Sequence, residues 1–332
     1  MDPLRSLLSA TGNCTVLSTV SQEEDEQAWL TARTRGIGGS DIGAICGVNN
    51  YSSPRLVYLR KTGQYEDGEK FSDSSLERMH FGRVLEPVVA DEYQSRSGRK
   101  VVCAGATLAH KQYPWALANV DRLIVDDEGV PYGVLECKTA GEYMNGDWDD
   151  GELPLSYIYQ LQWYLFVTGL NFGAFACLVG GNKFYYYEIY RNDEMLNEIF
   201  PVVKSFWEDS VCKLVEPELV GTDADREYVS DVNSGVIKGS EIVLEDDVSN
   251  DLARTVKECK ARIKELEKAI EEASNRIKDR MKLNEICHTK DYYIKWSPRS
   301  QVRVDTDRFK SVFPEIYEQC KKTISYREMR IK

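Results

Sequence analysis

The sequence lacks the features of membrane proteins and of secreted, disulfide-stabilised proteins. No stretch approaches the roughly 20 apolar residues of a membrane span, and the longest apolar patch, Phe172 to Val179, contains a glycine. The N-terminus shows no basic region followed by an apolar run, so no secretory signal is expected. The nine cysteines form no C-x-x-C pair. This argues against a zinc ribbon or an iron–sulfur cluster and predicts reduced thiols in the cytosol.

The composition excludes wholesale disorder, because 332 residues with 42% hydrophobic side chains can bury a core. The formal net charge of −12 is unevenly spread. Residues 1–240 carry 21 basic and 36 acidic side chains, whereas residues 241–332 carry 21 and 18. Local cations or bound metal ions can offset an acidic surface, so this balance neither supports nor excludes nucleic acid as a partner.

The order of helical and strand patterns predicts an α/β fold in which helices flank a mixed central sheet. Helices are expected at residues 22–34, 41–47, 54–61, 74–96, 156–170 and 193–215. Strands are expected at residues 100–108, 115–125 and 131–139, followed by a hairpin of residues 172–180 and 183–190. Ser40 and Ser53 are expected helix caps. The candidate buried residues of helix 74–96 are Met79, Val84, Leu85, Val88 and Val89.

Changes in composition predict a domain of residues 1–216, a polar linker of residues 217–250, and a C-terminal extension of residues 251–332 with a long helix and a small α+β module. Apolar side chains recur along the long helix at alternating spacings of four and three, which is a heptad pattern. This seam consists of Leu252, Val256, Cys259, Ile263, Leu266, Ile270, Ala273 and Ile277. A single helix cannot bury it, so a partner helix, a symmetry mate or another part of this chain must cover it.

The most informative residues are Asp121 and, 15 and 17 positions later, Glu136 and Lys138. Alternate side chains of a strand share one side, so Glu136 and Lys138 point together and Cys137 points away. A hairpin can bring Asp121 beside Glu136. Two carboxylates at one point suit a hard cation such as Mg²⁺, and a neighbouring lysine can position a metal-bound water. Phosphodiester hydrolysis needs this set, although exposed charges on an edge hairpin give the same pattern.

Two helical segments carry further candidate residues. Glu86 directly precedes Pro87, and a proline inside a helix costs about 3 kcal/mol, so a kink is expected at this carboxylate. Alternatively, Glu86 is a solvated helical residue. Gln160 and Tyr164 share one face of an apolar helix, where Gln160 is either a satisfied core amide or a group that points into a site.

A glycine-rich run between Arg33 and Ser40 is the last candidate. This run could bind a phosphate. Its glycines allow close approach of the backbone, Ser40 begins a helix, and Arg33 and Arg35 supply guanidinium groups. The run lacks the spacing of a P-loop, and a simple turn is the alternative.

The segments contain the motifs Arg33-x-x-Gly36-Ile37-Gly38-Gly39-Ser40-Asp41-Ile42, Asn49-x-Tyr51-x-Ser53-Pro54, Phe81-Gly82-x-x-Leu85-Glu86, Asp121, Glu136-x-Lys138 and Gln160-x-x-x-Tyr164. Together these motifs resemble the YqaJ-type viral recombinase family, whose members are phage-related alkaline exonucleases similar to lambda exonuclease. The resemblance covers about residues 25–215. It implies a PD-(D/E)XK nuclease core and 5′–3′ digestion of linear double-stranded DNA, which leaves 3′ single strands for recombination by annealing.

The resemblance also implies roles for single residues. Asp121 and Glu136 would hold Mg²⁺, with Mn²⁺ as a substitute, and the backbone carbonyl of Cys137 would be a further ligand. Glu86 would be a third carboxylate, and Lys138 would act on the water. Gln160 would orient Lys138 or the nucleophile. Arg33 and Ser40 would bind the 5′-phosphate, and Arg35 is an additional candidate for that role.

Two features depart from this pattern. The long turn at residues 126–131 puts the strand pairing in question. The acidic cluster of Asp147, Asp149, Asp150 and Glu152 would repel DNA in a channel, so it is expected on an outer loop.

The expected partners are double-stranded DNA ends, a single-strand annealing protein and, by resemblance, two further copies in a ring-shaped homotrimer. The expected setting is the cytosol of a cell that hosts a phage or prophage. Three alternatives remain open: an endonuclease of the same fold, a RecB-like nuclease with an iron–sulfur cluster, and a DNA-end-binding or assembly module without catalysis. Ungrouped cysteines disfavour the cluster enzyme, and the complete set of Asp121, Glu136 and Lys138 disfavours the module.

Overall fold

A computed structural model describes residues 3–20, 24–64, 73–144, 148, 153–235, 237, 239–322 and 327–331. The chain divides into two compact units, Met1–Ser234 and Gly235–Lys332. All nine cysteines are free. In the described part of the chain, no helix combines the length and the apolar character that crossing a membrane would require.

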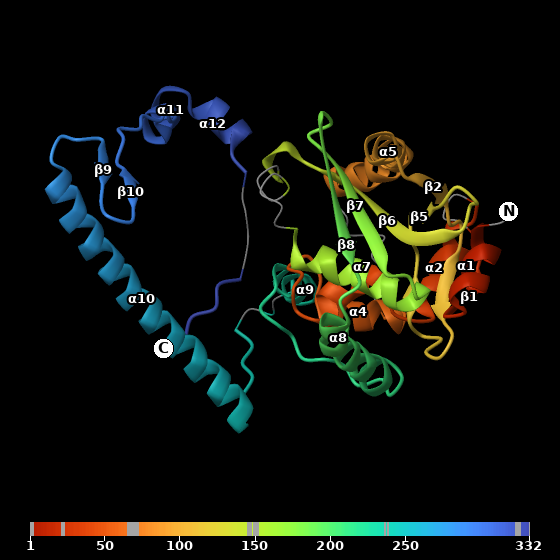
Figure 1. The fold of residues 1–332 in the computed structure, drawn as a ribbon. Helices are drawn as coiled ribbons and strands as arrows, with labels where there is room; N and C mark the ends of the chain where they lie inside the picture. The colour runs from red at the N-terminus through yellow and green to blue at the C-terminus, as the bar shows by residue number, and fades with distance from the viewer. Residues whose placement is uncertain are drawn as a thin grey trace. The chain divides into compact units, whose positions relative to one another are not determined.

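The first unit is built on a five-stranded mixed sheet with the order β2-β5-β6-β7-β8 (Figure 1). Strands β6 and β7 are parallel, and every other neighbouring pair is antiparallel. Because a parallel pair needs a long crossover, helix α7 (Leu155–Thr168) connects them. The predicted α/β fold with a mixed sheet is confirmed. The strands are β2 (Lys100–Cys103), β5 (Arg122–Val125), β6 (Pro131–Ala140), β7 (Phe172–Val179) and β8 (Lys183–Tyr190).

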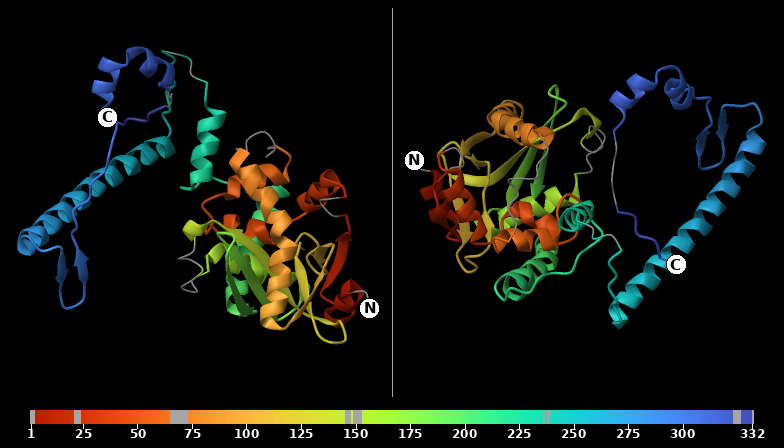
Figure 2. Two further views of the ribbon diagram at one scale, coloured as in Figure 1. Left: turned by 90° about the horizontal axis from the view of Figure 1, so that it is seen from above. Right: turned by 180° about the vertical axis from the view of Figure 1, so that it is seen from behind.

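Helices cover both faces of this sheet, with α5 (Asp73–Ser97) on one side and α7 on the other (Figures 1 and 2). The alternation of β6 divides its side chains between two cores. Leu135 packs with Val89 and Tyr93 of α5, whereas Val134 belongs to the larger core that includes Trp163 of α7. The even-numbered side chains of β6 therefore face α7, and the odd-numbered ones face α5.

Two of the predicted strands are wrong in extent, because each divides between two sheets. Residues 100–108 form β2 and then β3 (Thr107–His110), and residues 115–125 form β4 (Leu117–Ala118) and then β5. Strand β3 pairs with β4 and with β1 (Cys14–Ser18) in a separate three-stranded sheet. Gly105, at φ +57°, turns the chain between β2 and β3, a conformation that glycine adopts without strain.

Helix α5 agrees with the predicted helix within one residue at each end, but its buried face differs from expectation. It continues through Pro87 from Asp73 to Ser97. Of the residues predicted to be buried, Val89 is buried, but Met79, Val84 and Val88 are about half exposed. The reason is that the face of α5 that packs on the sheet carries Val89, Ala90 and Tyr93.

The shorter helices follow their local capping signals. Helix α4 begins at Pro54, where Ser53 Oγ accepts the Leu56 N–H at 3.2 Å, as predicted. Asp25 caps α2, and the predicted start of that helix at residue 22 lies outside the described residues. Further helices of this unit are α1 (Pro3–Thr11), α2 (Glu26–Thr34), α3 (Gly39–Ile45), α4 (Pro54–Lys61), the 3-10 turn η2 (Glu142–Met144), α8 (Asp193–Ser205) and the π-helical turn η3 (Phe206–Val211).

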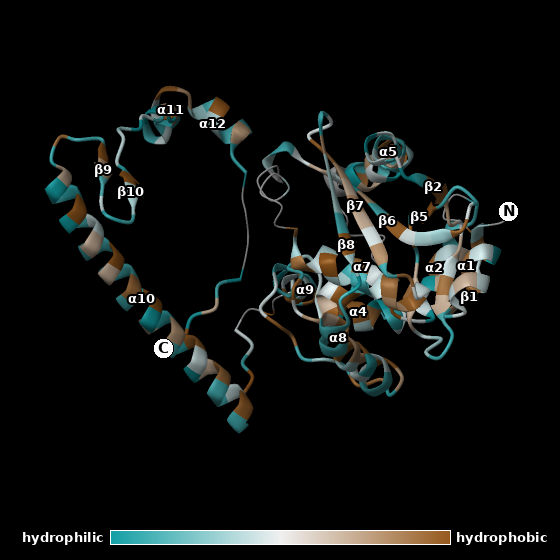
Figure 3. Cartoon of the chain, in the orientation of Figure 1, coloured by the Kyte–Doolittle hydropathy of each residue, from teal (hydrophilic) through white to brown (hydrophobic). Residues whose placement is uncertain are grey.

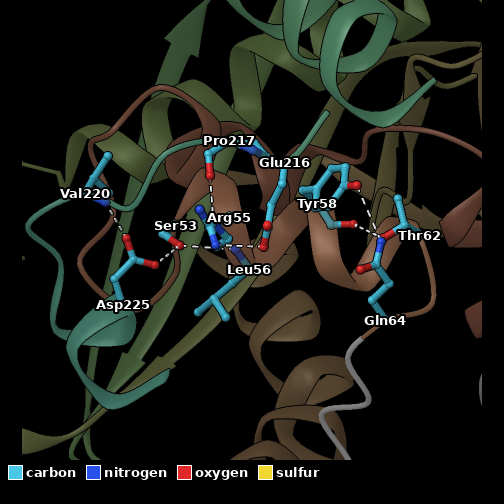
Figure 4. A network of polar contacts seen from close by, with 10 residues as sticks. All are labelled: Ser53, Arg55, Leu56, Tyr58, Thr62, Gln64, Glu216, Pro217, Val220 and Asp225. Atoms are coloured by element: carbon cyan, nitrogen blue, oxygen red, sulfur yellow. Dashed lines mark hydrogen bonds and ion pairs between the residues drawn. The ribbon is translucent and has the colours of Figure 1, made fainter. Parts of the chain in front are cut away.

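The segment expected to begin the linker folds onto the first unit, which ends at Ser234 rather than at residue 216. It contains α9 (Asp223–Val232). Figure 4 shows its polar anchors on α4: Ser53 Oγ donates to buried Asp225, and Arg55 donates to Glu216 Oε1 at 2.7 Å and to the Pro217 carbonyl at 2.6 Å. These side-chain contacts link positions about 160 to 170 residues apart, so local sequence patterns could not predict them.

We expect Asp225→Ala to lower the free energy of unfolding of the first unit by about 3 kcal/mol. Asp225 is 2% exposed and also accepts the Val220 N–H at 2.6 Å, so its removal leaves buried donors unpaired. Denaturant unfolding followed by circular dichroism measures the loss. Asp223→Ala on the same helix is the matched control, because Asp223 is largely exposed; equal losses in both variants would contradict the prediction.

The second unit holds the long helix α10 (Asp247–Met281), a hairpin of β9 (Ile286–His288) and β10 (Tyr293–Lys295), and two short helices, α11 (Thr306–Val312) and α12 (Pro314–Cys320). Asp246 caps α10 by accepting the Ser249 N–H at 2.7 Å. Helix α10 carries the entire heptad seam predicted from the sequence.

Candidate active site

Three polar side chains meet where β6 faces α7. Glu136 and Lys138 both belong to the even-numbered side of β6, and Gln160 comes from α7. Glu136 Oε1 accepts from Lys138 Nζ at 2.5 Å and from Gln160 Nε2 at 2.6 Å. Gln160 Oε1 lies 3.3 Å from Lys138 Nζ, so the amide bonds to both charged groups. Glu136 and Gln160 are buried, which means that water cannot satisfy them in place of these partners.

Asp121, the residue directly before β5, also belongs to this group. Its Oδ2 accepts the Cys137 N–H at 2.7 Å, which fixes the carboxylate at the middle of β6. Burial raises the pKa of Asp121 well above its usual range, and the charges of Glu136 and Glu86 raise it further. Two carboxylates therefore share one poorly solvated place, and a cation would be stabilised there.

Lys138 supplies part of the missing positive charge. Burial alone would lower the pKa of this ammonium group, but Glu136 and Asp121 hold it above its ordinary value. Lys138 Nζ also lies 5.1 Å from the ring centroid of Tyr157 on α7. The amine is therefore held as a cation between the acids and an aromatic face.

Glu86 approaches from the opposite face of the sheet. Arg122 pairs across the sheet with Leu135, so its side chain lies on the α5 side, where its Nη1 donates to Glu86 Oε1 at 2.5 Å. The charge of Glu86 acts on Asp121. Glu86 thus borders the acidic pair while its carboxylate is engaged by Arg122.

A hard divalent cation fits these residues. Glu136 Oε2 is buried without a hydrogen-bond partner among the described residues, and an unsatisfied buried carboxylate oxygen suits a metal ligand. Within the same residues, no group of three or more histidine, cysteine, aspartate or glutamate side chains forms a preassembled metal site. The protein would therefore supply two carboxylates, a ligand number typical of Mg²⁺ sites that retain water.

The run from Arg33 to Ser40, which the sequence predicted to bind a phosphate and which is called the cradle below, lies next to this group. Arg33 Nη2 donates to Ser40 Oγ at 3.0 Å. Ser40 is not the cap that the sequence predicted, because α3 begins at Gly39, two residues earlier than expected, with Gly38 as its N-cap. A Cβ on Gly39 would lie 2.4 Å from Tyr164 Cε1, so only glycine permits this approach.

Tyr164 connects the cradle to the acidic pair. Its hydroxyl accepts from Gln160 Nε2 at 3.0 Å. Burial, then Glu136 and Asp121, raise the pKa of Tyr164, whereas Arg33 lowers it. Tyr164 therefore packs against Gly39 of the cradle on one side and is hydrogen-bonded to Gln160, beside the acidic pair, on the other.

Other predicted site residues have different surroundings. Arg35 lines a shallow surface pocket with Leu17 and Asp25. The acidic cluster of residues 147, 149, 150 and 152 lies outside the described residues. Metal binding by the Cys137 carbonyl stays a prediction. Sequence reasoning missed Arg122 and Tyr157, although Arg122 directly follows Asp121 and Tyr157 lies one helical turn before Gln160.

A mixed sheet that brings an aspartate together with a Glu-x-Lys strand defines the PD-(D/E)XK class of α/β proteins. Residues 28–171 match a family model described as a YqaJ-like viral recombinase domain. The chain is 38% identical over 321 residues to the protein YqaJ of Bacillus subtilis (strain 168). The aligned residues cover 94% of this chain and 96% of that protein. The chain therefore belongs to the YqaJ family, as predicted.

Solved structures with similar folds include the alkaline exonuclease LHK-Exo from Laribacter hongkongensis, at 20% identity and a TM-score of 0.47, covering 63% of this chain and 98% of that one. A phage-related exonuclease from Haemophilus somnus 129PT gives 10% identity and a TM-score of 0.41, covering 54% of this chain and 96% of that one.

Proposed function

We propose that this protein is a Mg²⁺-dependent exodeoxyribonuclease that digests linear double-stranded DNA from 5′ ends. The observation that supports this most is the convergence of Asp121, Glu136 and Lys138 beside a buried carboxylate oxygen that has no hydrogen-bond partner in the described part of the chain. Two buried carboxylates at one place repel each other, so a bound cation beside Lys138 would stabilise the pair. Membership of a viral recombinase family agrees with a DNA substrate.

Each residue has a separate task in this proposal. Asp121 and Glu136 hold the metal ion, with Glu86 adding negative charge from the α5 side. When bound, Mg²⁺ or Mn²⁺ neutralises the phosphate and makes water nucleophilic at neutral pH. Lys138 stabilises the charge that develops on the scissile phosphate. Gln160 holds Lys138 and Glu136 in one geometry through a hydrogen bond to each of them.

The cradle of Arg33 and Ser40 accounts for the direction of digestion. A guanidinium and a hydroxyl near a helix start suit a terminal phosphate. Binding of a 5′-phosphate there would present the first phosphodiester of that strand to the acidic pair. Removal of this strand leaves a 3′ single strand, so we propose a single-strand annealing protein as the functional partner.

We expect Arg33→Ala to erase most of the preference for a 5′-phosphorylated end, reducing the ratio of rates on phosphorylated and unphosphorylated duplex by about 10-fold or more. The guanidinium that donates to Ser40 would be gone, whereas the acidic pair would stay intact. Digestion of paired substrates with and without the phosphate measures the ratio. Arg35→Ala is the matched control; an unchanged ratio in Arg33→Ala removes that residue from the role.

One assay tests the proposed function against its alternatives. The protein is incubated with linear duplex that carries or lacks a 5′-phosphate, and with closed circular DNA, in Mg²⁺ or in EDTA. Loss of linear duplex only, dependent on Mg²⁺ and faster with the phosphate, is the expected result. Cutting of closed circles would indicate an endonuclease. Binding without cutting would indicate an end-binding module.

A further inference from the structure

Within the described residues of the second unit, most of the heptad seam of α10 is exposed. Leu252, Ile263, Leu266 and Ile270 are 62%, 54%, 55% and 65% exposed, and apolar residues recur along the whole helix in Figure 3. From Leu252 to Ile277 the row is roughly 38 Å long. Scattered exposed apolar residues are ordinary, but a continuous heptad row indicates a helical partner.

The residue types within the seam favour two strands. The a positions are all β-branched: Val256, Ile263, Ile270 and Ile277. Leucine occupies two of the d positions, and Cys259 and Ala273 occupy the others. β-branched residues at a with leucine at d favour a two-stranded coiled coil over larger bundles.

The charges beside the seam suit a second copy of the same helix. In a parallel pair, Arg262 at a g position faces the e position that Glu267 holds in the partner. In a fully overlapped antiparallel pair, Lys260 and Glu267 face each other from two e positions. Neither arrangement places like charges opposite each other at the e and g positions. The charges beside the seam therefore do not disfavour self-association in either direction.

We propose that two copies of this chain associate through α10 as a two-stranded coiled coil. The proposal depends only on the seam and not on the catalytic site. It differs from the three-chain ring that the family resemblance implies, and the solution mass distinguishes the two.

The first experiment is measurement of the mass of the full chain by sedimentation across a concentration series. We expect a dimer whose dissociation constant rises about 100-fold or more in Ile263→Glu, because each copy would bury a carboxylate in the apolar seam in either direction of pairing. Ala261→Glu adds the same charge on the outer face of the helix and should leave the constant unchanged. A monomer, a three-chain mass, or an association that Ile263→Glu leaves unchanged would overturn the proposal.

The second experiment uses Cys259, which is exposed in the single chain. In a parallel pair it meets the same residue of the partner at a d layer, so mild oxidation would give a covalent dimer. In the antiparallel pair it meets the partner's Ile270, so a covalent dimer would need Ile270→Cys. Serine replaces the other exposed cysteines, Cys103, Cys212 and Cys320. A covalent dimer in either case supports the proposal, and its absence in both contradicts it.

Discussion

Glu136→Gln is expected to reduce the rate of DNA hydrolysis by about 1,000-fold or more while the protein stays folded. The amide has nearly the same shape as the carboxylate, so its oxygen can still accept from Lys138 and Gln160 at the positions that Glu136 Oε1 occupies. What disappears is the charge, and with it the anionic ligand at Oε2, which is buried. Metal affinity and hydrolysis should therefore fall together.

Initial rates on linear duplex over a series of Mg²⁺ concentrations measure this effect. Glu142→Gln is the matched control, because Glu142 lies in η2 just after the same strand and is exposed. The control should digest DNA at the normal rate. Near-normal hydrolysis by Glu136→Gln, with unchanged dependence on Mg²⁺, would remove Glu136 from the site.

Local patterns in the sequence are sufficient to predict most of the helices and the centre of the sheet. Ser53 and Pro54 mark the start of α4, and the alternation of residues 131–139 gives β6. Sequence patterns do not show which sheet a strand joins, because that depends on distant partners. Strand β3 pairs with β1, which lies over 90 residues earlier, and periodicity alone could not separate it from β2.

The same division applies to the candidate site. The period of two places Glu136 and Lys138 on one side of β6 without knowledge of the fold. The engagement of Glu86 by Arg122 depends on which face of the sheet α5 covers. The closeness of Gly39 to Tyr164 depends on the packing of α3 against α7. Residues that act through such tertiary contacts do not occur at a fixed spacing in the sequence, so a sequence pattern cannot predict their roles.

Lys138→Met is expected to lower the hydrolysis rate by about 100-fold or more, with a different pattern of stability from that of Glu136→Gln. Methionine replaces the amine with an apolar chain of similar length. Asp121 and Glu136 then lose the cation that offsets their charge. Burying unpaired charge is costly, so the metal-free variant should unfold at a lower temperature than the native protein.

Mg²⁺ should restore much of the stability of Lys138→Met, because a divalent cation between the two carboxylates replaces the lost charge, but it should not restore hydrolysis. Thermal unfolding in EDTA and in Mg²⁺, together with rates on linear duplex, separates the two effects. Lys183→Met is the control, because Lys183 begins β8 and is exposed. Recovery of both stability and activity would show that Lys138 serves only to balance the acids in the empty site.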